Sequence, residues 1–214
     1  MFFRTPFFLP FIYPSLTWRV PAEEKTIYLT FDDGPVPGPT EFVLNTLHHY
    51  QIKATFFCIG HNVQKHPEIF KRVIHEGHSV GNHTFHHLKG WNYSAEDYLA
   101  NVNQCEEQFA VSGFRFPVTG RKLFRPPYGR IKWSQIHRLN DYRIIMWDVL
   151  SSDYDKHLNE EKCLRGSIRA TRSGSVVVFH DSVKAEKNMT YVLPRYIDHF
   201  LNKGFTFDVI PPSP

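Results

Sequence analysis

The sequence alternates regularly between short apolar runs and longer runs with helical spacing. The apolar runs are expected to be strands at 26–31, 53–60, 78–83, 142–149 and 175–181, with a short strand leading into a loop over 122–129. Helical spacing fills most of the segments between them, at 41–51, 62–77, 94–112, 133–140, 159–171 and 192–204, and residues 205–210 close the chain. This alternation predicts an α/β fold with a parallel sheet, a distorted or incomplete (β/α) barrel in a single domain.

The first 20 residues differ from the rest because they are rich in proline and aromatic residues. Pro6, Pro10 and Pro14 interrupt any apolar helix of a signal peptide, and no small-residue cleavage site follows. The segment is also too short and too broken to span a bilayer. We expect residues 1–20 to pack on a domain formed by residues 21–214, in a cytoplasmic protein without a transmembrane span. Export through an atypical N-terminus is the alternative.

Charge and cysteine content argue against a nucleic-acid partner, a disulfide framework and a thiolate zinc site. The net charge is +4, from 25 basic and 21 acidic residues without a Lys/Arg run, so no nucleic-acid partner is expected. The three cysteines are far apart, odd in number and form no CxxC pair. They are expected to be reduced and mostly buried, which argues against a disulfide framework and against a thiolate zinc site.

Polar residues follow several of the predicted strands. In parallel α/β folds the active site lies where the carboxyl ends of the strands meet, so these side chains are expected to share one site. Polar residues at so many strand ends require a reason, because strand interiors prefer apolar side chains. The set is Asp32, Asp33, His83, Arg125, Asp148, His180 and Asp181.

Three histidines in "GNHTFHHLKGW" raise the possibility of a metal site. If "HTFHH" (83–87) turns into a helix, His83 and His87 lie on one face and within reach of one ion, although His83 and His86 are also a possible pair. The adjacent carboxylates Asp32 and Asp33 repel each other, which a cation on one and a proton-accepting role for the other would relieve. Spacing alone leaves the choice of ligands open.

Five short motifs occur in an order that resembles a known family. They are "TFDDGP" (30–35), "HTFHH" (83–87), "FRPPYG" (124–129), "WDVLSSDY" (147–154) and "VVVFHD" (176–181). Together they are similar to the motifs of the polysaccharide deacetylases, carbohydrate esterase family 4, with the NodB-homology domain. The resemblance covers roughly residues 20–210.

The resemblance implies a role for each matching residue. It makes Asp33, His83 and His87 the ligands of one divalent metal, usually zinc, with cobalt or nickel also compatible, and it places His86 at a variable position. The other implied roles belong to Asp32 as general base, Arg125 as the residue that orients it, His180 as general acid, Asp153 as the carboxylate that tunes the acid, and Tyr128, after Pro127, as an oxyanion donor through its backbone N–H.

Two motifs depart from the family pattern where it commonly shapes the acetyl pocket. Leu150 and Tyr154 replace an aspartate and a tryptophan, and Val178 replaces a leucine. These changes leave the implied catalytic set intact but put the substrate in doubt. Asp148 and Asp181 receive no role from the resemblance, and we expect either to support a ligand or His180.

The resemblance therefore implies a metal-dependent hydrolase. The expected reaction removes N-acetyl groups from GlcNAc-type sugars in peptidoglycan, chitin-like oligomers or another glycan, so the expected partner is an acetylated saccharide. Two alternatives stay open: an O-acetyl esterase or non-sugar amidase of the same family, and a non-catalytic glycan-binding domain. The sequence specifies no oligomeric state.

Overall fold

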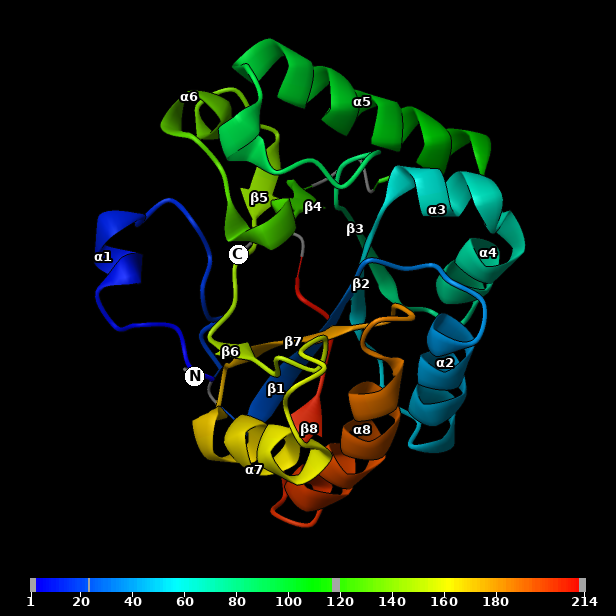
Figure 1. Cartoon of the computed structure of the whole chain (residues 1–214), viewed down its shortest axis with the longest axis vertical. Helices are drawn as coiled ribbons and strands as arrows, with labels where there is room; N and C mark the ends of the chain where they lie inside the picture. Colours follow the sequence, from blue (N-terminus) through cyan, green and yellow to red (C-terminus); the bar gives the residue numbers. More distant parts are fainter. Residues whose placement is uncertain (1–2, 23, 117–119, 212–214) are drawn as a thin grey trace.

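One curled parallel sheet forms the centre of the molecule (Figure 1). The computed structural model describes residues 3–22, 24–116 and 120–211. Within them the strands run in the order β5-β4-β3-β2-β1-β7-β6, all pairs parallel, and β8 pairs with the start of β1. The strands are β1 (Thr26–Asp32), β2 (Thr55–Cys58), β3 (Ser79–Asn82), β4 (Lys122–Phe124), β5 (Tyr142–Ile144), β6 (Val149–Leu150), β7 (Val176–His180) and β8 (Thr206–Phe207). The predicted incomplete barrel is confirmed.

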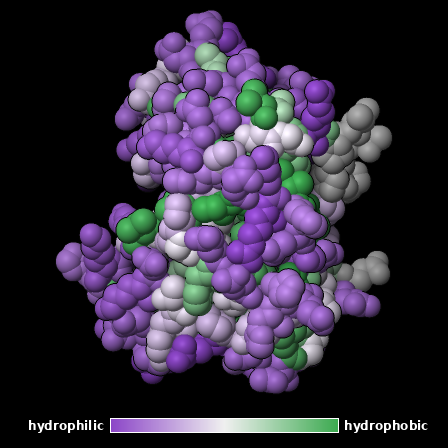
Figure 2. Space-filling view, turned by 90° about the vertical axis from the view of Figure 1, so that its right-hand side faces the viewer, coloured by the Kyte–Doolittle hydropathy of each residue, from purple (hydrophilic) through white to green (hydrophobic). Residues whose placement is uncertain are grey.

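Helices cover the outside of the sheet (Figure 1). Their bounds are α1 (Leu9–Ile12), α2 (Pro39–His49), α3 (Gly60–Lys65), α4 (Pro67–His75), α5 (Ala95–Val111), α6 (Trp133–Ile136), α7 (Glu160–Ala170) and α8 (Glu186–Leu201), with 3-10 turns at Gly90–Asn92 and Pro127–Gly129. The face that carries α2, α3 and α4 is mostly hydrophilic, with scattered apolar side chains (Figure 2). These helices therefore turn their apolar sides toward the sheet.

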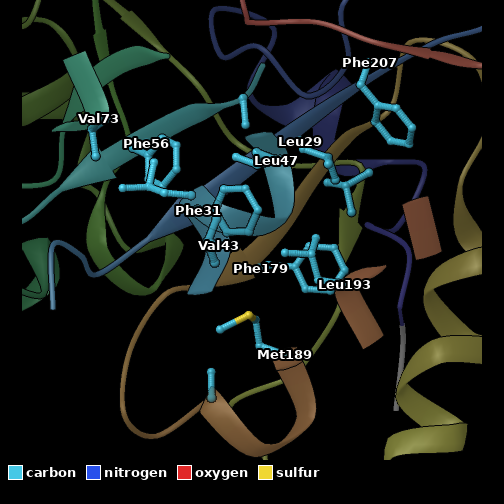
Figure 3. Packing of buried hydrophobic residues seen from close by; sticks show 14 of the residues in the cluster. Leu29, Phe31, Val43, Leu47, Phe56, Val73, Phe179, Met189, Leu193 and Phe207 are labelled. Atoms are coloured by element: carbon cyan, nitrogen blue, oxygen red, sulfur yellow. The ribbon is translucent and has the colours of Figure 1, made fainter. Parts of the chain in front are cut away.

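The largest core cluster lies between β1 and the helices α2 and α8. Leu29 and Phe31 of β1 are fully buried, and Phe31 stacks on Phe56 of β2 with ring centroids 5.1 Å apart. Val43 and Leu47 approach from α2, while Met189 and Leu193 approach from α8 (Figure 3). This packing fixes β1 rigidly, and β1 ends at Asp32.

Two predicted elements are divided in the structure. The helix expected over 62–77 is two helices, because Pro67 lacks an N–H donor and starts a new helix after His66. The strand expected over 142–149 is also interrupted, and β5 and β6 are separated by residues 145–148. In that gap the backbone bonds to the N-terminal segment: Met146 N–H donates to the Thr17 carbonyl, and Thr5 N–H donates to the Asp148 carbonyl.

The N-terminal segment lies along the open side of the sheet between β5 and β6. Isolated β-bridges join Arg4 to Val149, Thr17 to Ile145 and Arg19 to Ser175. Leu16, Trp18 and Val20 are buried. Residues 1 and 2 of the predicted segment lie outside the described residues, and its boundary at residue 20 stays a prediction. In the described part of the chain, no helix is both long and apolar enough to cross a membrane.

Candidate active site

The carboxyl end of β1 directs two adjacent aspartates to different partners. Asp32 is the last residue of the strand and is buried, whereas Asp33 has a φ of 86° and leaves the strand direction. The Asn62 side chain donates to the backbone carbonyl of Asp33 at 2.7 Å. The next residue, Gly34, donates its N–H to Asp181 at 3.0 Å. The turn after β1 is therefore held from two sides, by α3 and by the residue after β7.

The "HTFHH" stretch is a loop and not a helix, so helical spacing is not what brings His83 and His87 together. Thr84 and His87 have φ values of 62° and 55°, which a right-handed helix does not tolerate. The loop is held by asparagines that the sequence analysis did not single out. Asn82 accepts the Thr84 N–H at 2.8 Å, and Asn101 of α5 accepts the N–H groups of Phe85 and His86 at 3.0 Å each.

This loop places His83 and His87 against Asp33. Asp33 Oδ1 lies 3.7 Å from His83 Nε2 and 3.2 Å from His87 Nε2. Within the described residues, these three side chains are the one group of at least three His, Cys, Asp or Glu whose ligand atoms all lie within 4.8 Å of one another. His86 is exposed, and its ring lies beside that of His61, with centroids 5.8 Å apart.

The donor set fits a divalent cation. His83 donates from Nδ1 to the Arg125 carbonyl at 2.7 Å, which leaves Nε2 directed at Asp33 and free to bind. Two imidazole nitrogens and one carboxylate form the three-ligand set of open catalytic zinc sites, in which further positions remain for water and substrate. The three residues could therefore hold one metal ion.

Electrostatics favour the ligand forms of two of these side chains. Burial lowers the pKa of His83 to about 4 despite the nearby charges of Asp32 and Asp33, so its imidazole is neutral at pH 7. Burial would raise the pKa of Asp33, but the hydrogen bond from His87 and the positive charge of His180 hold it below its ordinary value. A neutral imidazole and an ionised carboxylate are the forms that bind metal.

Arg125 fixes Asp32 on one side of this cluster. The fully buried guanidinium donates from Nη1 to Asp32 Oδ1 at 2.6 Å and to the Thr30 hydroxyl at 2.7 Å. Its other nitrogens donate to the carbonyls of Ile145 and Met146, and it lies over the Phe57 ring at 4.1 Å. With so many partners the guanidinium cannot turn, so Asp32 is held in one orientation.

His180 and Asp153 form a pair at the end of β7. His180 Nδ1 lies 2.8 Å from Asp153 Oδ1, and the His180 N–H donates to Asp153 Oδ2 at 2.8 Å. Burial would lower the pKa of His180, but the charge and hydrogen bond of Asp153 outweigh it and raise the pKa to about 9. The imidazole is therefore protonated at neutral pH and can donate a proton.

The remaining predicted substrate-contacting residues differ in exposure. Tyr128 is 60% exposed, has a φ of 59°, and its ring centroid lies 4.6 Å from that of His87. Pro127 beside it is buried. Tyr154 meets His180 edge to face at 4.9 Å and is half-buried. Val178 in β7 is only 1% exposed.

The two aspartates without an assigned role are far from equivalent. Asp181 accepts the Gly34 N–H and lies 2.7 Å from the Thr40 hydroxyl, so it supports the turn that carries Asp33. Asp148 precedes β6 and bonds to Ser175 at the amino end of β7 and to Arg172. Asp148 therefore lies apart from the other strand-end residues. The strand predicted over 142–149 stops at Ile144, so Asp148 does not stand at its carboxyl end.

The comparisons with known proteins agree with this arrangement. Residues 19–145 match the family model described as polysaccharide deacetylase. A peptidoglycan-N-acetylglucosamine deacetylase from Bacillus cereus is 33% identical over 195 residues, which cover 90% of this chain and 89% of the relative. A chitooligosaccharide deacetylase from Azorhizobium caulinodans is 28% identical and covers 90% and 96%. The crystal structure of the Bc1960 peptidoglycan N-acetylglucosamine deacetylase with a naphthalenyl N-oxidanyl-benzamide superposes with a TM-score of 0.86 at 28% identity, covering 97% and 95%.

These matches define a class of hydrolase, the metal-dependent enzymes that remove N-acetyl groups from glycans by cleaving amide bonds. The chain belongs to the polysaccharide deacetylase family, carbohydrate esterase family 4, as its motifs predicted.

Proposed function

We propose that this protein is a zinc-dependent deacetylase that hydrolyses the acetamide of GlcNAc-type units in a peptidoglycan-like or chitin-like saccharide. One observation carries the proposal. Asp33, in the cluster with His83 and His87, directly follows Asp32, a carboxylate held by Arg125, and Asp32 is paired across the neighbouring strand with His180, a protonated imidazole held by Asp153. Acid, base and metal ligands thus converge at the carboxyl ends of the strands, and the named relatives act on such glycans.

The metal and the base would act on the attacking water. A divalent cation held by Asp33, His83 and His87 supplies Lewis-acid chemistry, which polarises a carbonyl and lowers the pKa of water. Zinc suits two imidazoles and a carboxylate. Asp32 accepts the proton of the water that attacks the acetyl carbon, and Arg125 keeps its carboxylate in place.

His180 and Tyr128 would serve the later part of the reaction. The backbone N–H of Tyr128 donates to the developing oxyanion. His180 gives its proton to the sugar nitrogen as the carbon–nitrogen bond breaks, so that acetate and a free amine leave. Tyr154 against His180 and Val178 in β7 border the place of the acetyl methyl group.

The experiment follows acetate and amine together. The zinc-loaded protein is incubated with N-acetylglucosamine oligomers, peptidoglycan fragments and an O-acetylated xylan. We expect equal amounts of acetate and new primary amine from the N-acetylated substrates. Acetate from xylan without an amine product would instead establish the esterase alternative. Glycan binding without any acetate would establish the non-catalytic alternative.

Asp32→Asn is the control variant for this assay. The asparagine keeps the size of the side chain but cannot accept a proton, so turnover should fall roughly 10²-fold or more while zinc content stays near one ion per chain. Wild-type turnover in the zinc-loaded variant would remove Asp32 from the base role.

A further inference from the structure

We infer that the N-terminal segment and the basic side chains beside it form a docking surface for an anionic phospholipid bilayer. The surface combines exposed apolar side chains of residues 7–12 with a cluster of arginines next to them. A protein that binds in this way lies on the headgroup region of the bilayer and does not span it. The inference is independent of the proposed function.

The apolar part of this surface lies in and just before α1. Phe7 is 82% exposed and Phe11 is 81% exposed, and Phe8 and Ile12 are about half exposed. These four side chains are the apolar patch. Helix α1 contains no buried residue and lies at the left edge of the molecule in Figure 1. Large apolar side chains that gather in water in this way mark a surface that binds a partner.

The apolar patch borders a hollow that arginines also line. The hollow has a volume of about 580 Å³, and both Phe7 and Phe11 line it. Arg19, Arg143 and Arg172 belong to the same lining. Guanidinium groups bind phosphate well, because their N–H donors match its oxygen atoms. The surface therefore offers contacts to an apolar group and to a phosphate side by side, as a phospholipid requires.

Arg4, Arg19 and Arg172 form an arginine cluster at the carboxyl end of α7. Arg4 donates from Nε to the Ala170 carbonyl at 2.9 Å. The other two arginines share the Asp148 carboxylate, at 3.7 and 3.2 Å. Burial lowers the pKa of Arg19 most, and the positive charges of Arg172 and Arg4 lower it further despite the nearby carboxylate. Like charges are thus held close together, and a bound anion would relieve their repulsion.

The basic surface continues along α7. Lys162, Arg165 and Arg169 are exposed, and their spacing of three and four residues places them on one face of this helix. With Arg4 they line a second hollow, of about 720 Å³. The two glutamates at the start of α7 instead contact α8. Positive charge therefore extends from the N-terminal segment over the exposed side of α7.

A second copy of this chain is a poorer partner for the surface than a bilayer is. A symmetric contact brings the same patch of both copies together, so the arginine cluster of one copy would meet that of the other. An anionic bilayer has the opposite charge, with an apolar interior beneath the headgroups. Each basic residue near such a bilayer strengthens binding about fivefold, and buried apolar area adds to this.

The test measures binding to lipid vesicles by co-sedimentation. One set of vesicles contains equal parts of phosphatidylcholine and phosphatidylglycerol, and the other contains phosphatidylcholine alone. We expect the wild-type protein to bind the anionic vesicles at least about tenfold more strongly than the neutral ones, and this binding should weaken as salt is added. Equal binding to both sets, or no binding to the anionic set at low salt, would overturn the inference.

A double variant tests the apolar patch. Phe7→Ser/Phe11→Ser removes its two most exposed side chains and should weaken binding to the anionic vesicles about tenfold or more. Val111→Ser is the matched control, because Val111 is 82% exposed at the end of α5 and lies outside the patch. This control should bind as the wild type does. Undiminished binding of the double variant would contradict the inference.

Arg19→Gln tests the arginine cluster and should weaken binding to the anionic vesicles about fivefold. Arg138→Gln is its control, since the side chains of Arg19 and Arg138 are 42% and 49% exposed and Arg138 pairs with Glu96 of α5. Arg138→Gln should bind as the wild type does. An equal loss in both variants would mean that net charge alone is responsible, and it would overturn the inference.

Gel filtration without lipid distinguishes a bilayer from a second copy as the partner of the apolar patch. The wild type and Phe7→Ser/Phe11→Ser should elute at the same volume. A wild-type dimer that this double variant converts to a monomer would assign the patch to a second copy and overturn the inference.

Discussion

At the end of β1, backbone conformation separates two neighbouring carboxylates. Asp32 continues the strand and meets Arg125, while the positive φ of Asp33 turns its side chain toward His83 and His87. Two aspartates in a regular strand would point to opposite faces of the sheet. The turn instead brings both into one site with different partners, which is what a base beside a metal ligand requires.

Metal content should depend on His87 and not on His86. His87→Ala removes one of three ligands, so the bound zinc of the purified, dialysed variant should fall well below one ion per chain. His86→Ala is the matched control, because that side chain is exposed and lies outside the cluster, and it should keep the wild-type content. Elemental analysis measures both, and full occupancy in His87→Ala would refute the ligand assignment.

Activity should fall at alkaline pH when His180 loses its proton. Its pKa is raised to about 9, so the acid form is present below that value and is lost as the pH rises through it. Asp153→Asn removes the charge that raises the pKa, and burial then lowers it. The alkaline limb of kcat/KM should move down by about one unit or more.

Asp155→Asn is the control for this pH profile, since Asp155 belongs to the same loop but bonds to the His157 N–H. Its alkaline limb should stay where the wild-type limb is. An unmoved limb in Asp153→Asn would exclude Asp153 from tuning the acid.

At the scale of elements, the N-terminal segment contributes to the core as a strand would. Trp18 is 8% exposed and packs in the cluster that includes Phe124 of β4 and Met146. Trp18→Ala should lower the free energy of unfolding by about 3–5 kcal/mol, the usual cost of removing a buried tryptophan. Phe11→Ala, at an 81% exposed position of α1, should change it by no more than about 0.5 kcal/mol. Denaturant unfolding compares the two, and equal stabilities would mean that the segment is not part of the folded unit.

Which elements could be predicted depends on the range of the interactions that determine them. β1 and α2 follow from local patterns, because apolar runs and helical spacing report burial directly. The loop conformation of "HTFHH" could not be predicted, since Asn101, which holds it, is 16 residues away from Phe85 in an ordinary helix. The break between β5 and β6 likewise depends on Thr5 and Thr17, more than 120 residues earlier.

The residues of the candidate site also fall into two groups: those that motif order could predict and those whose positions depend on tertiary packing. Motif order was sufficient to predict Asp33, His83 and His87 as a cluster, and the structure brings them together. Asn62 carried no signal, because its contact with the Asp33 carbonyl arises only when α3 packs beside β1. Asp148 was misplaced because strand limits decide which end of the sheet a residue occupies, and short strands have poorly defined limits in sequence.

The predicted cytoplasmic location stays a prediction.

At the scale of the whole molecule, the reactivity of the cysteine thiols shows whether the core becomes accessible only when the whole protein unfolds. Cys58, Cys105 and Cys163 are free and buried, and burial raises the pKa of each thiol. A thiol that is both inaccessible and protonated does not react with a disulfide reagent. The native protein should therefore show no rapid reaction with Ellman's reagent, while three thiols per chain should react in denaturing guanidinium chloride. Rapid reaction of even one thiol in native buffer would show that a part of the core opens separately.

The bridge between Thr17 and Ile145 also has a consequence for how the chain is made. The two residues are separated by 145 − 17 = 128 positions, so at ordinary synthesis rates the ribosome needs roughly 6–26 s to add the later partner after the earlier one. During that interval the aromatic segment around Thr17 has no sheet edge on which to pair. Thr17 and the aromatic residues around it are thus made long before the edge on which they pair, and they wait as an exposed apolar segment of the kind that chaperones bind.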